Sequence, residues 1–303
     1  MRHVLTLFDL TVDDIQAIFA MATTLKKALA KGIREPRFAG YVQALLFEKP
    51  SLRTRVSFET AFAQLGGTTL YLGADVGWGH RESPADFSRV LSQYVDVVVC
   101  RAKEHTRVET LAAHSTCPVI NGLTDLYHPC QALADLYTVA EVCGGLEGLK
   151  LAFVGDANNV ARSLAVACAK LGVKFAIAAP AHYQFDTPFL KRLEEQQPNL
   201  YVKVTTDPLE AVRDADIVYT DVWVSMGQEG ERSQRLGALS KYQVNGELLA
   251  HAPSRVRFMH CLPARRGEEV TDEIMDGPHS IVVQQAANRM HLQKGLLAWL
   301  LGR

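Results

Sequence analysis

The 303-residue sequence lacks a long hydrophobic run, an excess of charge of either sign and any Cys-x-x-Cys pair. No apolar stretch approaches the roughly 20 residues of a transmembrane helix, and the apolar part of the N-terminus is too short for a signal peptide. The net charge of −1 leaves no basic surface of the kind that binds nucleic acid or anionic membranes. We therefore expect a cytoplasmic protein with neither a nucleic-acid nor a membrane partner.

Cysteine is sparse and scattered. The six cysteines lie at positions 100, 117, 130, 143, 168 and 261, in apolar surroundings. A chain of this length does not depend on a disulfide framework, so we expect reduced and mostly buried thiols. Cys261 differs from the others because it follows His260 at the end of a buried strand, where a thiol can act as a nucleophile or a proton relay.

The sequence does contain a regular alternation of β-rich runs and helical patterns. This alternation predicts an α/β fold of two domains, each a mostly parallel sheet with helices on both faces. Strands are expected at residues 42–47, 68–72, 95–100, 118–121, 150–155, 173–178, 201–205, 216–220, 256–259 and 280–283. Helices are expected at residues 11–31, 52–65, 84–93, 105–114, 128–142, 159–170 and 286–301.

Glycines between Cys143 and Lys150 separate a long helix from a new strand and mark a domain boundary. The boundary predicts two domains of about equal size, residues 1–145 and 146–285. The last helix, within residues 286–303, can pack on either of them.

The segment around Ser51 carries the strongest functional signal. Ser51 stands at the expected N-cap of the helix that follows strand 42–47. A helix N-terminus presents unpaired N–H groups and a positive dipole end, and this one adds the hydroxyls of Ser51 and Thr54. Arg53 and Arg55 add two guanidiniums that oppose the helix dipole, so helix stability does not explain them. The segment predicts a site for a compact anion, and phosphate fits best.

Polar residues also follow several other predicted strands. They are Arg101, His128 with Gln131, Asp156 to Asn159, Asp221, and His260 with Cys261. In a parallel sheet the carboxyl ends of the strands lie at one edge, where ligands bind. The recurrence of polar residues at these ends predicts a ligand site in each domain.

Some of these residues also have a purely structural interpretation. His128 and Gln131 share a helix face, and a histidine at a helix start is biased toward the neutral imidazole that can donate to a carbonyl oxygen. Its structural alternative is packing against Tyr127. Asp221 either holds a ligand ammonium or caps a loop, and Cys261 is either reactive or an ordinary buried thiol.

Two further kinds of site have weaker support. A zinc site built from His128, Cys130, His260 and Cys261 lacks the familiar ligand spacing. The turn from Gly155 to Asn159 follows a strand but lacks the G-x-G-x-x-G spacing of a dinucleotide site, so a nucleotide-dependent dehydrogenase is disfavoured.

Four motifs, in this order along the chain, resemble signatures of the carbamoyltransferase family. Ser51 to Arg55 (SLRTR) resembles the S-x-R-T-R signature, and residues 128–131 (HPCQ) resemble the HPxQ element. Residues 260–263 (HCLP) match the HCLP motif. Residues 221–227 (DVWVSMG) are similar to the D-x-x-x-S-M-G loop of the family members that use ornithine rather than aspartate. The resemblance runs from about Leu5 to the last helix.

The resemblance implies that residues 1–145, joined by helix 286–303, bind carbamoyl phosphate and that residues 146–285 bind ornithine. It implies the reaction of carbamoyl phosphate with L-ornithine to give L-citrulline and phosphate, in arginine metabolism, with no metal and no organic cofactor. It also implies a homo-oligomer, a trimer or a multiple of trimers, whose active sites are shared between subunits.

The same resemblance implies roles for individual residues. Carbamoyl phosphate contacts Ser51, Leu52, Arg53, Thr54, Arg101, His128, Gln131 and Arg289, and ornithine contacts Asn159, Asp221, Ser225, Met226, Cys261 and Leu262. Arg101 and His128 polarise the carbonyl with Thr54, and Gln131 holds the carbamoyl NH2. Asp221 and Cys261 assist the loss of a proton from the δ-amine. Arg55 matches the motif, but we expect it to support the structure.

One loop departs from the family pattern. Members usually carry a glutamine after the second strand that reaches a neighbouring subunit, yet there is none between Tyr71 and Gln93. Trp78 or His80 is the candidate replacement. The departure leaves open a transferase for another amine, such as putrescine or N-acetylornithine. A non-catalytic paralogue that acts as a binding subunit is a separate alternative, although such a protein is expected to lose some of the Arg, His and Cys residues and none is lost here. The intact S-M-G sequence favours ornithine.

Overall fold

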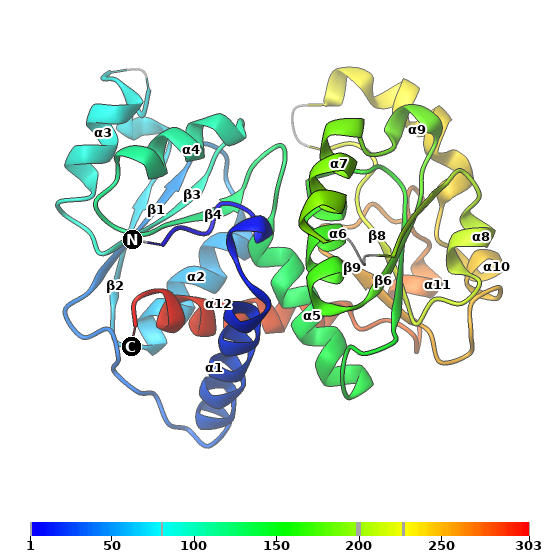
Figure 1. Cartoon of the computed structure of the whole chain (residues 1–303), viewed down its shortest axis with the longest axis horizontal. Helices are drawn as coiled ribbons and strands as arrows, with labels where there is room; N and C mark the ends of the chain where they lie inside the picture. Colours follow the sequence, from blue (N-terminus) through cyan, green and yellow to red (C-terminus); the bar gives the residue numbers. More distant parts are fainter. Residues whose placement is uncertain (1, 80, 198–200, 226–227, 303) are drawn as a thin grey trace. The chain divides into compact units, whose positions relative to one another are not determined.

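The computed structural model describes residues 2–79, 81–197, 201–225 and 228–302 (Figure 1). The chain forms two compact units. Unit 1 runs to Tyr137 and resumes at Ala287, and unit 2 is Thr138–Ala286. One division falls inside helix α5 (Pro129–Cys143), before the glycines that mark the boundary in the sequence, and the other falls inside α12 (Val282–Leu300).

Unit 1 contains a four-stranded parallel sheet. Its strands are β1 (Val42–Phe47), β2 (Thr68–Leu72), β3 (Val97–Arg101) and β4 (Val119–Leu123), in the order β2-β1-β3-β4. Its helices are α1 (Val12–Ala30), α2 (Leu52–Gln64), α3 (Pro84–Leu91), α4 (His105–His114), most of α5 and the end of α12. Two short 3-10 helices, Leu7–Asp9 and Ala74–Val76, complete it.

Helices cover both faces of this sheet. On one face, Leu91 of α3 and Val108 of α4 pack with Leu46 and Val98 from the sheet. Helices α1, α2 and α12 lie on the other side, as Figure 1 shows within this unit. Strand β2 lies on one side of β1, and the next strand, β3, lies on the other side of β1. The strand order therefore reverses between β1 and β3. That reversal is where ligands bind in open α/β sheets.

Unit 2 repeats the plan with five parallel strands. They are β5 (Lys150–Val154), β6 (Lys174–Ala178), β7 (Val202–Thr205), β8 (Ile217–Thr220) and β9 (Arg257–His260), in the order β7-β6-β5-β8-β9. Its helices are α6 (Asn159–Leu171), α7 (Thr187–Gln196), α8 (Pro208–Val212), α9 (Arg232–Leu239), α10 (Gly246–Leu249) and α11 (Asp272–Met275), with 3-10 turns at Ala181–Tyr183, Glu229–Glu231 and Ser240–Tyr242. The order reverses between β5 and β8.

The predicted two-sheet α/β architecture is confirmed, but the strand predicted at 280–283 is wrong. Ser280 makes a single parallel bridge with Phe258, and α12 begins at Val282 rather than at residue 286. The β-branched run from Ile281 to Val283 favours a strand by propensity. The N–H of Gln285 nevertheless bonds to the carbonyl of Ile281, and the Val283 side chain is 82% exposed, so the run opens a helix.

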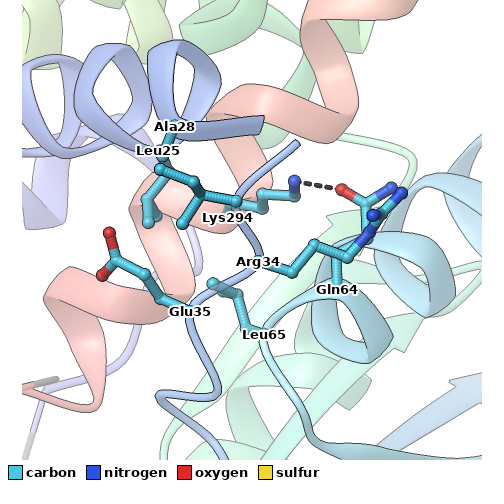
Figure 2. Close-up of a pocket in the computed structure, with 8 residues that line it drawn as sticks. Leu25, Ala28, Arg34, Glu35, Gln64, Leu65 and Lys294 are labelled. Atoms are coloured by element: carbon cyan, nitrogen blue, oxygen red, sulfur yellow. Dashed lines mark hydrogen bonds between the residues drawn. The ribbon is translucent and has the colours of Figure 1, made fainter. Parts of the chain in front are cut away.

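A small cavity of about 10 Å³ lies in unit 1, large enough for one water molecule but not for a substrate. It is lined by Leu25, Ala28, Ile33, Arg34, Glu35, Gln64, Leu65 and Lys294. Figure 2 shows the Lys294 ammonium donating to the Gln64 amide oxygen. Burial, with the Arg34 charge second, lowers the pKa of Lys294 to about 8. Among the described residues, no helix is both long and apolar enough to cross a membrane.

Candidate active site

The N-terminus of α2 lies at the carboxyl end of β1, as the sequence predicts. Ser51 is the N-cap, and its hydroxyl accepts a hydrogen bond from the Thr54 N–H at 3.4 Å. The first turn therefore directs its remaining N–H groups past the end of β1. Thr54 is buried and Arg53 is half-buried, whereas the Leu52 side chain is 73% exposed. Leu52 can thus contribute its backbone N–H but not an apolar contact within the unit.

Three guanidiniums converge on this helix end. Arg101 is the last residue of β3, and the pairing with β4 shifts register between Cys100 and Arg101, which re-aims the side chain. Arg289, from α12, donates to the Thr54 hydroxyl at 3.0 Å. Burial, and then the charges of Arg289 and Arg53, lower the pKa of Arg101 to about 10. Crowded cations of this kind are stabilised by a bound anion.

His128 is a neutral imidazole beside these guanidiniums. It immediately precedes α5, and its carbonyl accepts the N–H of Gln131 at 3.1 Å. Burial first, and then the charges of Arg289 and Arg101, hold the pKa of His128 well below its ordinary value. The ring therefore sits at a positive site without adding a charge of its own, which suits a hydrogen bond to a carbonyl oxygen.

Gln131 follows one turn later on α5. Its side chain is buried, and its Nε2 donates to the Asp135 carboxylate at 2.8 Å. In the described part of the chain, no donor lies within hydrogen-bond distance of Gln131 Oε1. Unit 1 thus presents hydroxyl, guanidinium, imidazole and amide groups together at the carboxyl ends of its strands.

Arg55 is exposed and faces outward from the same turn of α2. Its Nε pairs with Glu59 at 2.9 Å, and its guanidinium lies 3.8 Å from the centre of the Tyr71 ring. The ion pair lies within α2, and the contact with Tyr71 joins α2 to β2.

Trp78 is not placed to reach another subunit, contrary to one of the two replacements considered for the missing glutamine. Its side chain is 4% exposed and packs in the core of unit 1. Arg107 stacks on the ring at 4.6 Å and donates to the Trp78 carbonyl at 3.0 Å, while Glu48 pairs with Arg107 at 2.8 Å. The apolar bulk of tryptophan favours the core over a loop tip. His80, the other candidate, lies outside the described residues.

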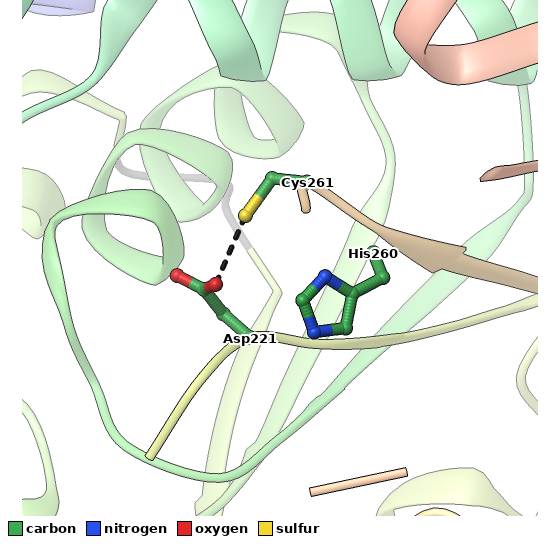
Figure 3. A group of neighbouring side chains, drawn as sticks. All are labelled: Asp221, His260 and Cys261. Carbon is green, nitrogen blue, oxygen red and sulfur yellow. Dashed lines mark hydrogen bonds between the residues drawn. The ribbon is translucent and has the colours of Figure 1, made fainter. Parts of the chain in front are cut away.

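In unit 2, three polar segments meet at the ends of β5, β8 and β9. Asp221 lies at their centre and is buried. The amide Nδ2 of Asn158 donates to Asp221 Oδ2 at 2.8 Å, and the Cys261 thiol donates to Oδ1 at 3.0 Å (Figure 3). Asn159 begins α6. The side-chain Oδ1 of Asn158 also caps this helix by accepting from the N–H groups of Val160 and Ala161. Asn158 belongs to the polar turn noted in the sequence but was not among the residues assigned there to the ligand.

A buried pair supports the segment that carries Cys261. The N–H of Leu262 donates to His260 Nδ1 at 2.9 Å, so the other ring nitrogen carries the proton and donates to Glu269 at 3.0 Å. Leu262 has a left-handed backbone with φ of 60°, which turns the chain sharply after β9. Asp221, His260 and Cys261 are close enough to hold a metal ion, but both ring nitrogens of His260 are already engaged.

Arg235 of α9 holds the loop that follows β8. Arg235 donates to the Trp223 carbonyl at 2.6 Å and forms an ion pair with Asp156. Burial raises the pKa of Asp156, and the charge of Arg235 offsets part of that rise. Ser225 follows and its N–H donates to Gln228 Oε1 at 3.0 Å. Met226 lies outside the described residues.

Cys130 is unsuited to be a ligand of the alternative zinc site. Cys130 is buried, donates its thiol to the Asn121 carbonyl at 3.5 Å, and has a pKa raised to about 12 by burial. Metal binding needs a thiolate. All six cysteines are free thiols; Cys143 is exposed and Cys261 partly exposed, while the others are buried.

Models of both domains of one enzyme family match this chain. The carbamoyl-phosphate-binding domain of the aspartate/ornithine carbamoyltransferases matches residues 2–141, and the aspartate/ornithine-binding domain matches residues 147–300. The chain belongs to the aspartate/ornithine carbamoyltransferase family.

Individual relatives narrow the comparison. The chain is 50% identical to an ornithine carbamoyltransferase of Bacillus subtilis over 303 residues, covering 99% of this chain and 94% of the relative. It is 48% identical to an ornithine carbamoyltransferase of Archaeoglobus fulgidus, covering 100% and 98%. The solved ornithine carbamoyltransferase of Pyrococcus furiosus superposes with a TM-score of 0.96 at 47% identity, covering 99% of this chain and 97% of the other.

Proposed function

We propose that this protein transfers the carbamoyl group of carbamoyl phosphate to L-ornithine, giving L-citrulline and phosphate. The observation that carries the proposal is the group of three guanidiniums around a helix N-terminus with a neutral histidine beside it. All of these residues except Arg289 lie in the part of the chain that matches a carbamoyl-phosphate-binding domain, residues 2–141. Relatives about half identical over the full chain are ornithine carbamoyltransferases, which supports ornithine as the acceptor.

In this proposal the end of α2 binds the phosphate. The backbone N–H groups of residues 52 and 53 and the hydroxyls of Ser51 and Thr54 donate to its oxygens. Arg53 and Arg289 supply charge, and the Thr54 hydroxyl that receives the Arg289 hydrogen bond is thereby oriented. These donors bind the phosphate more tightly as it leaves, because its negative charge grows when the C–O bond breaks.

A second set of residues is assigned to the carbonyl group of carbamoyl phosphate. Attack by the amine builds negative charge on the carbonyl oxygen, and a guanidinium and a neutral imidazole are suited to stabilise it. Arg101 and His128 are assigned this role, with the Thr54 hydroxyl. Gln131 is assigned to the carbamoyl NH2, since its Oε1 is an acceptor. Removing one such donor typically costs about 3 kcal/mol of transition-state stabilisation.

The residues gathered in unit 2 are assigned to ornithine. Asn159, Asp221, Ser225 and the Met226 N–H are assigned to the α-amino and carboxylate groups. Cys261 and the Leu262 carbonyl are assigned to the δ-amine, which must lose a proton before it attacks. The 3.0 Å contact between the thiol and the carboxylate of Asp221 gives that proton a route away from the nitrogen.

The test is a set of steady-state reactions with carbamoyl phosphate and one acceptor at a time. Ornithine, N-acetylornithine, putrescine and aspartate are compared by the ureido product and the phosphate released. Citrulline formation at the highest kcat/KM is expected. A higher value with another amine would assign the protein to that amine, and no product with any acceptor would favour a non-catalytic binding subunit.

We also propose that the chain assembles as a trimer or a multiple of trimers. Apolar side chains on unit 1 support an interface there: Leu52, Val56, Leu70, Val90 and Tyr94 are all exposed. Sedimentation equilibrium should give three chains or a multiple, and a monomer at micromolar concentration would contradict this. The cytoplasmic location expected from the sequence stays a prediction.

A further inference from the structure

The amide of Gln131 is held by a carboxylate one helical turn further along α5. Gln131 is 1% exposed and Asp135 is fully buried, and Nε2 of the first donates to Oδ1 of the second at 2.8 Å. The four-residue spacing places both on one helix face, with His128 three residues before Gln131 on that face. None of the motifs that identify the family includes Asp135.

This hydrogen bond determines which end of the amide is available to a ligand. A carboxylate oxygen accepts hydrogen bonds and does not donate them, so the NH2 of Gln131 must face Asp135. The amide oxygen then points the other way, and among the described residues nothing donates to it. A buried acceptor without a donor is costly, so its presence indicates a ligand that brings an N–H or O–H group.

We propose that Asp135 is a positioning residue that orients Gln131 and thereby makes the site prefer an acyl phosphate bearing NH2 over one bearing CH3. The proposal rests on the proposed function, because it takes the ligand of this site to be carbamoyl phosphate. Asp135 itself touches no substrate. It acts by excluding the amide orientation in which the NH2 of Gln131 would face the NH2 of carbamoyl phosphate.

Acetyl phosphate is the natural probe of this selection. It differs from carbamoyl phosphate by a methyl group in place of NH2, and its phosphate and carbonyl can engage the same donors. Bound acetyl phosphate leaves Gln131 Oε1 without a donor, whereas carbamoyl phosphate supplies one. Sites built to hydrogen-bond a polar group discriminate strongly against analogues that lack it.

The experiment compares the full-length wild type with Asp135→Asn, Gln131→Met and the double variant. For each we measure KM for carbamoyl phosphate and the competitive inhibition constants of acetyl phosphate and inorganic phosphate. Asparagine keeps the shape of aspartate but both donates and accepts, so the Gln131 amide can turn over. The preference for carbamoyl over acetyl phosphate should fall at least about threefold in Asp135→Asn, while phosphate inhibition stays within about twofold.

The double variant separates positioning from a general structural role. If Asp135 acts through Gln131, adding Asp135→Asn to Gln131→Met should not change the preference further. An unchanged preference in Asp135→Asn, or a parallel loss of phosphate binding, would overturn the inference. Asp135→Ser replaces Asp135→Asn if circular dichroism shows that the latter does not fold, and the same outcomes apply. A wild type that forms no citrulline refutes the proposed function instead, and equilibrium competition between the two acyl phosphates then still tests the role of Asp135.

Discussion

Replacing Arg101 with methionine should stabilise the unliganded protein while removing its function. The Arg101 side chain is buried beside the charges of Arg289 and Arg53, and burial first, then these charges, lower its pKa to about 10. At about 1.4 kcal/mol for each pKa unit, the buried charge costs the folded state on the order of 3 kcal/mol. Methionine has a similar length and no charge, so we expect a gain of about 1–3 kcal/mol after some loss of packing.

The stability change must be read from unit 1 alone, because a chain with two compact units need not unfold in one step. The chain has three tryptophans, and Trp223 is the one in unit 2. In a Trp223→Phe background, fluorescence during urea unfolding therefore reports Trp78 and Trp299, both in unit 1. Arg55→Met is the matched control: it removes an arginine from the first turn of α2, close to the site, where Glu59 already offsets the charge.

The same Arg101→Met substitution that stabilises the unliganded protein should weaken the binding of its anionic ligands. Inorganic phosphate at saturation should raise the urea midpoint of the wild type and of Arg55→Met, since a ligand that binds only the folded state stabilises it. It should raise the midpoint of Arg101→Met by less, because the variant keeps Arg53 and Arg289 but lacks one of the three charges at this site, and kcat/KM for carbamoyl phosphate should fall at least about 100-fold. A variant that is less stable than the wild type, and that phosphate stabilises as strongly as it does the wild type, would refute the reasoning.

Three further predictions concern separate side chains. Arg53→Ala should raise KM for carbamoyl phosphate at least about tenfold with an unchanged circular dichroism spectrum, and wild-type affinity would remove Arg53 from the phosphate site. Cys261→Ala should lower kcat at least about tenfold while the thermal midpoint moves little, because the thiol is partly exposed; normal turnover would remove Cys261 from the mechanism. Lys294 has a folded pKa of about 8 and an ordinary value of 10.5, so the unfolded state binds more protons between these pH values. Wild-type stability should therefore rise across this range relative to Lys294→Met, by on the order of 1–3 kcal/mol, and parallel pH profiles would contradict the cause assigned.

Local signals in the sequence located most of the fold. The capping residue Ser51 and the residue run that follows it predicted α2 to within one residue at its start. Propensity failed at Ile281 to Val283, where an apolar β-branched run opens a helix because Gln285 bonds back to Ile281. The sequence analysis placed no helix at α7, α8, α9, α10 or α11. Of these, α8, α10 and α11 have only four or five residues, which carry too little periodicity to distinguish from a loop.

The site was predictable as a set of strand ends, but its internal contacts were not. Parallel topology brings Arg101 and Ser51 to neighbouring strand ends, and this follows from the alternation of elements alone. The contact of Arg289 with Thr54 joins residues 235 positions apart, and no local pattern encodes it. The hydrogen bond between Asn158 and Asp221 joins residues 63 positions apart, and no local pattern encodes it either.

One competition reaction tests the central claim most directly. The wild-type protein is given limiting carbamoyl phosphate with ornithine, N-acetylornithine and putrescine at equal concentrations, and the ureido products are separated by mass. The account predicts citrulline as the dominant product, with one phosphate released for each citrulline formed. A dominant product from another amine, or phosphate release without any ureido product, would contradict it.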